Sequence, residues 1–166
     1  MNVQDSQKMA ALLNGSGYET TEDPREADLI LVNTCSIREK AAQKICSQLG
    51  RFRDLKEANP HLLIGVGGCL AQQWGERFFK RIPHLDFVFG THQIHRLPEM
   101  VGDLEQKGGR AVETGLCDRV ASLGIVARPN KGAVSTFVTI MQGCNNYCAY
   151  CVVPSLRGPE ESRPLD

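Results

Sequence analysis

The sequence contains no apolar run that approaches the ~20 residues of a membrane-spanning helix. Residues 1–5 (MNVQD) also lack the basic and apolar regions of a secretory signal peptide. Neither sign of charge dominates, because 19 Lys and Arg residues stand against 19 Asp and Glu residues. We therefore expect a cytoplasmic, monomeric protein with no membrane partner. If its substrate is RNA, most of the surface that neutralises phosphates must lie outside these residues.

The sequence also gives little support to a disulfide framework. Its seven cysteines are an odd number, and no leader directs the chain to an oxidising compartment. Metal or redox chemistry is the better interpretation of this cysteine content. With 166 residues, the chain can hold one ordinary domain and a remnant of another.

Three of the cysteines, Cys144, Cys148 and Cys151, lie in the stretch GCNNYCAYC. Their spacing lets one tight loop direct three thiolates at a single metal centre. A structural zinc site uses four protein ligands, usually as two pairs, and histidines at positions 61, 84, 92 and 95 do not complete such a set. A [4Fe–4S] cluster is normally held by four thiolates, so three would leave one iron open. The spacing favours such a cluster over a zinc loop or three unrelated thiols.

Short apolar runs alternate with segments of helical periodicity through the first two thirds of the chain. Asp5 is a plausible N-cap for the first helix, and Gly15-Ser16-Gly17 would end it. Alternating strands and helices predict an α/β fold with a doubly wound parallel sheet. The expected strands cover residues 27–32, 62–66 and 86–90, and the expected helices cover residues 5–14, 41–52, 70–78 and 97–104.

Cys35 and Cys69 each follow the carboxyl end of an expected strand, which is the edge where open α/β sheets build their sites. Free cysteines are more often small buried residues, and that alternative stays open for both. Gly67-Gly68 favours a functional role for Cys69, because glycines let the backbone approach a bulky ligand. Cys46, inside a helix, and Cys117, in a loop, receive no role.

Periodicity is lost between residues 115 and 132, which predicts a linker. The next segment, residues 134–141, is an expected strand that leads into the three-cysteine loop, with no helix or second strand after it. A lone parallel strand cannot bury both faces. We therefore expect residues after 132 to be poorly ordered or to add to another sheet edge. The predicted organisation is a domain over 1–114, a linker over 115–132 and the start of a second domain over 133–166.

Further stretches carry a family resemblance. They are residues 33–41 (NTCSIREKA), 68–73 (GCLAQQ), 95–100 (HRLPEM), and Arg157-Gly158 with residues 162–164 (SRP). Together with the three-cysteine loop and Tyr150 before its last cysteine, they resemble radical S-adenosylmethionine enzymes, in the MiaB-type methylthiotransferase branch that modifies tRNA. The resemblance covers essentially the whole chain. It implies an N-terminal domain with an auxiliary [4Fe–4S] cluster on three cysteines, a radical barrel and a small RNA-binding domain.

The resemblance assigns Cys35 and Cys69 to two of the three auxiliary ligands. The third stands in a Cys-Gln-Met-Asn motif of the family, whereas this chain begins at Met1-Asn2. The resemblance thus implies a chain that lacks the first strand, the third ligand, nearly all of the barrel and the RNA-binding domain. We expect this fragment to be inactive alone.

The implied reaction adds a methylthio group to C2 of N6-isopentenyladenosine at tRNA position 37, next to the anticodon. Two [4Fe–4S] clusters and S-adenosylmethionine are the implied cofactors, with Cys144, Cys148 and Cys151 holding the cluster that binds S-adenosylmethionine. The cofactor supplies both a methyl group and a 5′-deoxyadenosyl radical, and the protein contributes ligation and placement. The implied partners are tRNA, an electron-donor protein and a sulfur donor.

Three other functions remain as alternatives. A sister enzyme methylthiolates an aspartate of a ribosomal protein, and a third relative modifies threonylcarbamoyladenosine. The motifs around Asn2 and Ser36 are more similar to those of the enzyme for isopentenyladenosine, which is an argument from association. From a different class, the chain could be a non-catalytic metal-binding module whose cysteines hold zinc.

Overall fold

A four-stranded parallel sheet forms the centre of the computed structural model, which describes residues 2–36, 39–117, 121–125 and 134–164. The strand order is β1-β2-β3-β4, and every neighbouring pair is parallel. The predicted α/β class with a parallel sheet is confirmed. The strands are β1 (Leu29–Thr34), β2 (Leu63–Gly68), β3 (Phe87–Phe89) and β4 (Ala111–Glu113).

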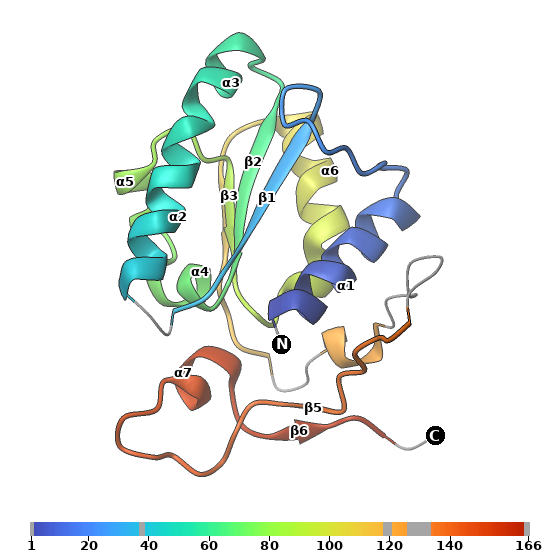
Figure 1. Cartoon of the computed structure of the whole chain (residues 1–166), viewed down its shortest axis with the longest axis vertical. Coiled ribbons are helices and arrows are strands. Elements are labelled where there is room, and N and C mark those ends of the chain that lie inside the picture. Colours follow the sequence, from blue (N-terminus) through green and yellow to red (C-terminus); the bar gives the residue numbers. More distant parts are fainter. Residues whose placement is uncertain (1, 37–38, 118–120, 126–133, 165–166) are drawn as a thin grey trace.

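Helices cover both faces of the sheet (Figure 1). Because side chains alternate along a strand, Phe87 and Phe89 enter the core on one face and Val88 enters the core on the other. The first face is covered by α1 (Asn2–Gly15), η1 (Ile94–Arg96) and α6 (Leu97–Lys107). The second is covered by α2 (Glu39–Arg51), α3 (Arg53–Ala58), α4 (Cys69–Trp74) and α5 (Arg77–Arg81).

Several predicted boundaries need correction. Residues 27 and 28 lie outside β1, which instead continues to Thr34, because Asn33 and Thr34 still pair with the backbone of β2. Asp5 is not an N-cap: it lies inside α1, which begins at Asn2. The helix expected over 70–78 is two helices, since the backbone of Gly75 turns out of the helical region at a φ of 47°.

The C-terminal segment, residues 134–164, differs most from the prediction. The expected strand over 134–141 reduces to β5 (Met141–Gln142), which pairs antiparallel with β6 (Glu161–Ser162) and not with the four-stranded sheet. A further helix, α7 (Val153–Arg157), lies between them. The expectation that no helix or second strand follows was therefore wrong. Of the predicted linker, residues 118–120 and 126–132 lie outside the described residues, and η2 (Ala121–Gly124) is a short helix.

The C-terminal segment lies beneath the edge at which β1 and β2 end, and the start of α1 faces it (Figure 1). Helix α7 packs against α4, which itself begins at Cys69. Within the described ranges, no helix is both long and apolar enough to cross a bilayer. The fold therefore brings α7 to the carboxyl edge of the sheet, where sequence reasoning placed Cys35 and Cys69.

Candidate functional site

The carboxyl edge of the sheet holds Cys35 and Cys69 on neighbouring strand ends. Thr34 and Gly68 are register partners, so the two cysteines are the next residues after a paired position. Adjacent strands lie only ~4.8 Å apart. Both cysteines are half-buried free thiols. The structure thus brings these two predicted site residues to the same place.

Gly68 permits this close approach. Its φ is 92°, and a Cβ there would lie 2.4 Å from the Thr34 carbonyl oxygen and 2.5 Å from Asn33 Oδ1. The Thr34 hydroxyl donates to the Gly67 carbonyl at 2.6 Å and accepts from the Ala71 amide at 3.2 Å, in the first turn of α4. Glycine at position 68 therefore lets the ends of β1 and β2 meet.

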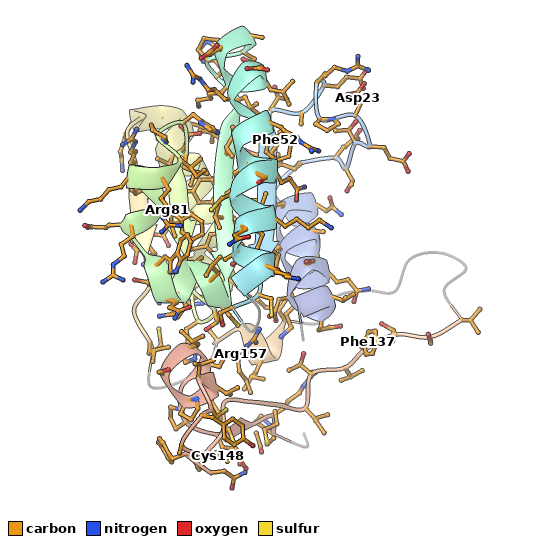
Figure 2. The ribbon with its side chains drawn as sticks, turned by 60° about the vertical axis from the view of Figure 1, so that its left-hand side comes forward. Asp23, Phe52, Arg81, Phe137, Cys148 and Arg157 are labelled. Atoms are coloured by element: carbon orange, nitrogen blue, oxygen red, sulfur yellow. The ribbon has the colours of Figure 1, made fainter. Side chains whose placement is uncertain are left out.

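Arg157, at the end of α7, reaches this edge from the C-terminal segment. Its guanidinium donates to Asp5 Oδ2 at 2.7 Å and also lies against the Cys69 thiol. Burial lowers the pKa of Arg157, but Asp5 and then Cys69 raise it by more, so the net direction is upward. Figure 2 shows Arg157 between the helices of the sheet domain above and the cysteine loop below. The result is a buried charged contact between the two parts of the chain.

Lys8 adds a second cation beside the same contact. Lys8 is almost fully buried, and this burial lowers its pKa. Asp5 raises the pKa of Lys8, whereas Arg157 and Arg163 lower it further. Lys8 and Arg157 therefore both interact with the carboxylate of Asp5, and Arg157 also interacts with Cys69. A guanidinium beside a sulfur favours the thiolate form, which is the form that binds metal.

Two residues that follow β3 hold the backbone of α7. The Thr91 hydroxyl donates to the Leu156 carbonyl at 2.6 Å. His92 accepts from the Cys117 amide at Nδ1 (3.1 Å), so its proton is on Nε2, which donates to the Arg157 carbonyl at 2.8 Å. Both Thr91 and His92 are fully buried. The edge of the sheet thus binds α7 by its main chain as well as by a side chain.

Helix α1, strand β5 and the residues that follow β1 also contain buried polar atoms with no hydrogen-bond partner among the described residues. They are Gln4 Oε1, Ser36 Oγ and Gln142 Nε2. Buried polar groups are normally paired, and each exception needs a cause such as a bound ion or water. The Ser36 hydroxyl, next in sequence to Cys35, and the thiols of Cys35 and Cys69 together fit a polar or metal-containing group at this edge.

The three-cysteine loop is closed at its base. Residues 141–142 pair with 161–162 in β5 and β6, and the Cys144 amide donates to the Gly158 carbonyl at 3.3 Å. Gly143 has a φ of 79°, and a Cβ there would lie 1.8 Å from the Pro159 carbonyl oxygen, so only glycine fits. Backbone contacts within residues 141–162 therefore close the base of the loop.

Within the loop, Cys144, Cys148 and Cys151 are all free thiols. Cys148 and Cys151 line a pocket of about 300 Å³ with Tyr147, Pro154 and Ser155. Across the residues that the structure describes, no group of three or more His, Cys, Asp or Glu side chains is placed to hold one metal ion. The donor chemistry of the three thiols suits a metal cluster, and that they share one stays a prediction.

The sequence carries little indication of the residues that join α7 to the edge of the sheet. Arg157 entered only through the family resemblance, and Asp5 was interpreted as a helix cap. Thr91 and His92 had no signal at all, because their roles depend on α7, which the sequence analysis did not expect. Cys117 also belongs to this region, since its amide binds His92 and Gln93 Nε2 donates to its sulfur at 3.3 Å.

Comparison with known proteins gives consistent matches. The chain is 58% identical to a protein of Syntrophus aciditrophicus over 99% of this chain and 36% of that protein. It is 56% identical to one of Geobacter metallireducens, over 98% of this chain and 37% of that protein. It is 50% identical to one of Photobacterium profundum, over 100% of this chain and 35% of that protein. Each of the three is named tRNA-2-methylthio-N(6)-dimethylallyladenosine synthase.

The chain spans about a third of the length of these curated relatives. Its first half also matches a family model. That model, described as uncharacterized protein family UPF0004, matches residues 1–90, which cover β1 to β3 and include Cys35 and Cys69. The chain therefore belongs to the UPF0004 family.

Proposed function

We propose that this chain is part of a tRNA-2-methylthio-N6-dimethylallyladenosine synthase, a radical methylthiotransferase. The observation that carries the proposal is identity of 50–58% with enzymes of that name over nearly the whole chain. The reaction adds a methylthio group to C2 of N6-isopentenyladenosine at position 37 of tRNA. An aromatic C–H of this kind resists ordinary bases and nucleophiles, so a radical route suits it.

Two sets of cysteines would hold the cofactors. Cys144, Cys148 and Cys151 would hold a [4Fe–4S] cluster whose fourth iron is left to S-adenosylmethionine. Cys35 and Cys69 would contribute to a second cluster at the carboxyl edge of the sheet. When bound, these groups supply the radical and the sulfur chemistry. The chain's own residues would ligate them, and the guanidinium of Arg157 would lie beside Cys69 at the second site.

The proposal extends to organisation and partners. Residues 1–114 would form the family's N-terminal domain, 115–132 a linker, and 133–166 the start of a radical domain. Substrate tRNA would bind through other parts of the enzyme, because the charge of this chain is balanced. An electron-donor protein and a sulfur donor would serve a monomeric enzyme in the cytoplasm.

Substitution of the three loop cysteines in the full-length enzyme tests the proposal. We expect Cys144→Ala/Cys148→Ala/Cys151→Ala to abolish reductive cleavage of S-adenosylmethionine after anaerobic reconstitution with iron and sulfide. Cys46→Ala, on α2, is the matched control and should retain cleavage. Iron content, 5′-deoxyadenosine and methylthio product in isopentenylated tRNA are measured. Cleavage that survives the triple substitution would show that the loop does not hold the cluster.

The same assays separate the alternatives. Modification of a ribosomal-protein aspartate in place of tRNA would identify the sister activity. Zinc bound at the cysteines, with no cluster after reconstitution, would identify a non-catalytic metal-binding module. The 166-residue chain alone should give no methylthio product, because the walls of the cofactor site lie elsewhere. Multiple turnovers by this chain would contradict that expectation.

A further inference from the structure

A buried ion pair joins the two ends of this chain. Arg157 and Asp5 have side chains only 7% and 5% exposed, and they are 152 residues apart in sequence. Asp5 lies in the first turns of α1, and Arg157 is the last residue of α7. Other ion pairs of the described residues include Arg53–Glu57 and Lys107–Asp103, which are largely exposed and lie within single helices. The Arg157–Asp5 pair is therefore placed to fix one part of the fold against another.

Arg157 is also held through its backbone. Its carbonyl accepts from His92 Nε2, and the preceding carbonyl, of Leu156, accepts from the Thr91 hydroxyl. The guanidinium thus reaches Asp5 from a helix whose main chain is already bound. These contacts come from α1 and from the loop after β3, so they restrict both the position and the direction of α7.

The same guanidinium interacts electrostatically with Cys69, the first residue of α4. Arg157 lies shortly after Cys151, on the return path of the cysteine loop, which closes at β5 and β6. One residue therefore connects a cysteine at the edge of the sheet with the segment that carries the other three. A shift of α7 would move the loop relative to Cys69.

We propose that Arg157 is a positioning residue: through its buried pair with Asp5 it holds the three-cysteine loop in a fixed place relative to the Cys35–Cys69 edge. The inference rests on the proposed function, in which both places hold clusters. Transfer between two bound groups needs a defined geometry, where a displacement of ~1 Å can cost on the order of a hundredfold in rate. Arg157 acts through the segment that it holds, because its side chain binds Asp5 and its carbonyl binds His92.

The energetics support a role in placement more than in stability. Burying two charges costs desolvation that their attraction only partly offsets, whereas removing one partner leaves the other charge buried and unpaired. Arg also presents a rigid fork that can contact a carboxylate and a sulfur together, which a Lys ammonium does less well. A buried Arg between Asp5 and Cys69 thus specifies one arrangement of the two segments.

Hydrogen exchange on the metal-free 166-residue chain tests the placement directly. In Arg157→Met, we expect the Leu156 and Gly158 amides, which are hydrogen-bonded in α7, to exchange faster by about tenfold or more. The amides of Ile64 and Val88, in the sheet core, should keep their wild-type rates. Arg53→Met, which breaks an exposed ion pair, is the matched control and should change neither set.

A second variant keeps the test decisive if Arg157→Met fails to fold. Asp5→Asn/Arg157→Met removes both charges, so Asp5 is not left buried and unpaired. This double variant should fold and should still exchange faster in α7 than wild type. Wild-type exchange in α7 would overturn the proposal. Equal acceleration of α7 and the sheet core would also overturn it, because that result describes a residue that only stabilises the fold.

A second measurement uses the reconstituted full-length enzyme. Arg157→Met should retain 5′-deoxyadenosine formation, which reports the loop cluster, while methylthio product falls by on the order of a hundredfold. An equal fall in both would overturn the proposal, since Arg157 would then support the radical site itself. If the wild-type enzyme cleaves no S-adenosylmethionine, the proposed function fails, and the exchange rates alone decide whether Arg157 fixes the loop.

Discussion

The sheet domain, which consists of the four-stranded sheet and its helices (residues 2–113), is stabilised by different interactions from the C-terminal segment. The sheet domain has two apolar clusters, one on each face, and Phe78, Phe87 and Phe89 are fully buried in them. The C-terminal segment, over its described residues 134–164, contributes one buried large apolar side chain, Leu156. It is attached instead through polar contacts of Leu156 and Arg157 with the sheet domain. Its apolar side chains, among them Phe137 and Ile140, are mostly exposed.

The difference has a physical meaning for each region. Apolar burial is non-directional, so it gives the sheet domain stability that tolerates small changes in geometry. Hydrogen bonds and ion pairs are directional, so they place the C-terminal segment at one position while adding little net stability. The sheet domain thus provides the folded body, and the C-terminal segment is oriented upon it.

The largest expected effect comes from the same substitution made in each region. Phe89→Ala removes a fully buried ring and should lower the free energy of unfolding by about 3–5 kcal/mol. Phe137→Ala, at a ring that is 66% exposed and lies on the extended segment at the side of the molecule in Figure 2, should cost less than about 0.5 kcal/mol. Urea unfolding followed by circular dichroism measures both. Comparable losses would mean that the two regions share one core.

A smaller effect is expected from a polar contact inside the sheet domain. Asp86 accepts from Lys56 Nζ at 2.9 Å through both oxygens and from the Ile64 amide at 2.8 Å, all partly buried. Asp86→Asn keeps only part of this set and should destabilise the domain by about 1–3 kcal/mol. Asp23→Asn, in an exposed pair with Arg25, is the control and should have no measurable effect. Equal unfolding midpoints for the two variants would show that polar contacts contribute little here.

The smallest effect concerns alkaline pH. Burial, and then its hydrogen bond to Glu105, raise the pKa of Tyr18 to about 12. Below about pH 10 the phenol of Tyr18 is protonated in both the folded and the unfolded protein. Above about pH 10 the unfolded chain loses this proton before the folded protein does. The contribution of Tyr18 is therefore complete below about pH 10 and is lost towards about pH 12.

Thermal unfolding at a series of alkaline pH values measures this contribution. Tyr18→Phe should decline less steeply than wild type, because its ring has no proton to lose. Tyr150→Phe, at an exposed ring in the C-terminal segment, should decline like wild type. Identical slopes for all three proteins would mean that the Tyr18–Glu105 contact does not persist in solution.

The elements of the sheet domain could mostly be predicted from the sequence, whereas those of the C-terminal segment could not. β1, β2, β3 and α6 were predicted because buried faces leave apolar runs or helical periodicity in the sequence. β4 was missed, since its three residues contain only Ala111 and Val112 as apolar signals. The run over 134–141 was wrongly interpreted as a buried strand, because apolar residues such as Phe137 and Ile140 can also lie exposed.

Of the candidate site, the sequence predicted the cysteines but not the contacts that hold α7 beside them. Cys35 and Cys69 could be placed at one edge, because parallel strands end on the same side of a sheet. The contact of Arg157 with Asp5 could not be predicted, since neither residue type nor spacing indicates a partner 152 residues away. Whether Cys144, Cys148 and Cys151 share a cluster stays a prediction that the cysteine substitutions will test.

The long separation of Asp5 and Arg157 also bears on the order of events during synthesis. The ribosome adds about 5–20 residues per second, so the 152 residues between the partners take on the order of ten seconds to appear. Once Cys69 has been made, the ends of β1 and β2 are present without α7 until Arg157 follows. Cys35 and Cys69 are therefore uncovered on the nascent chain, and any group inserted at this edge has a period of open access before the C-terminal segment arrives.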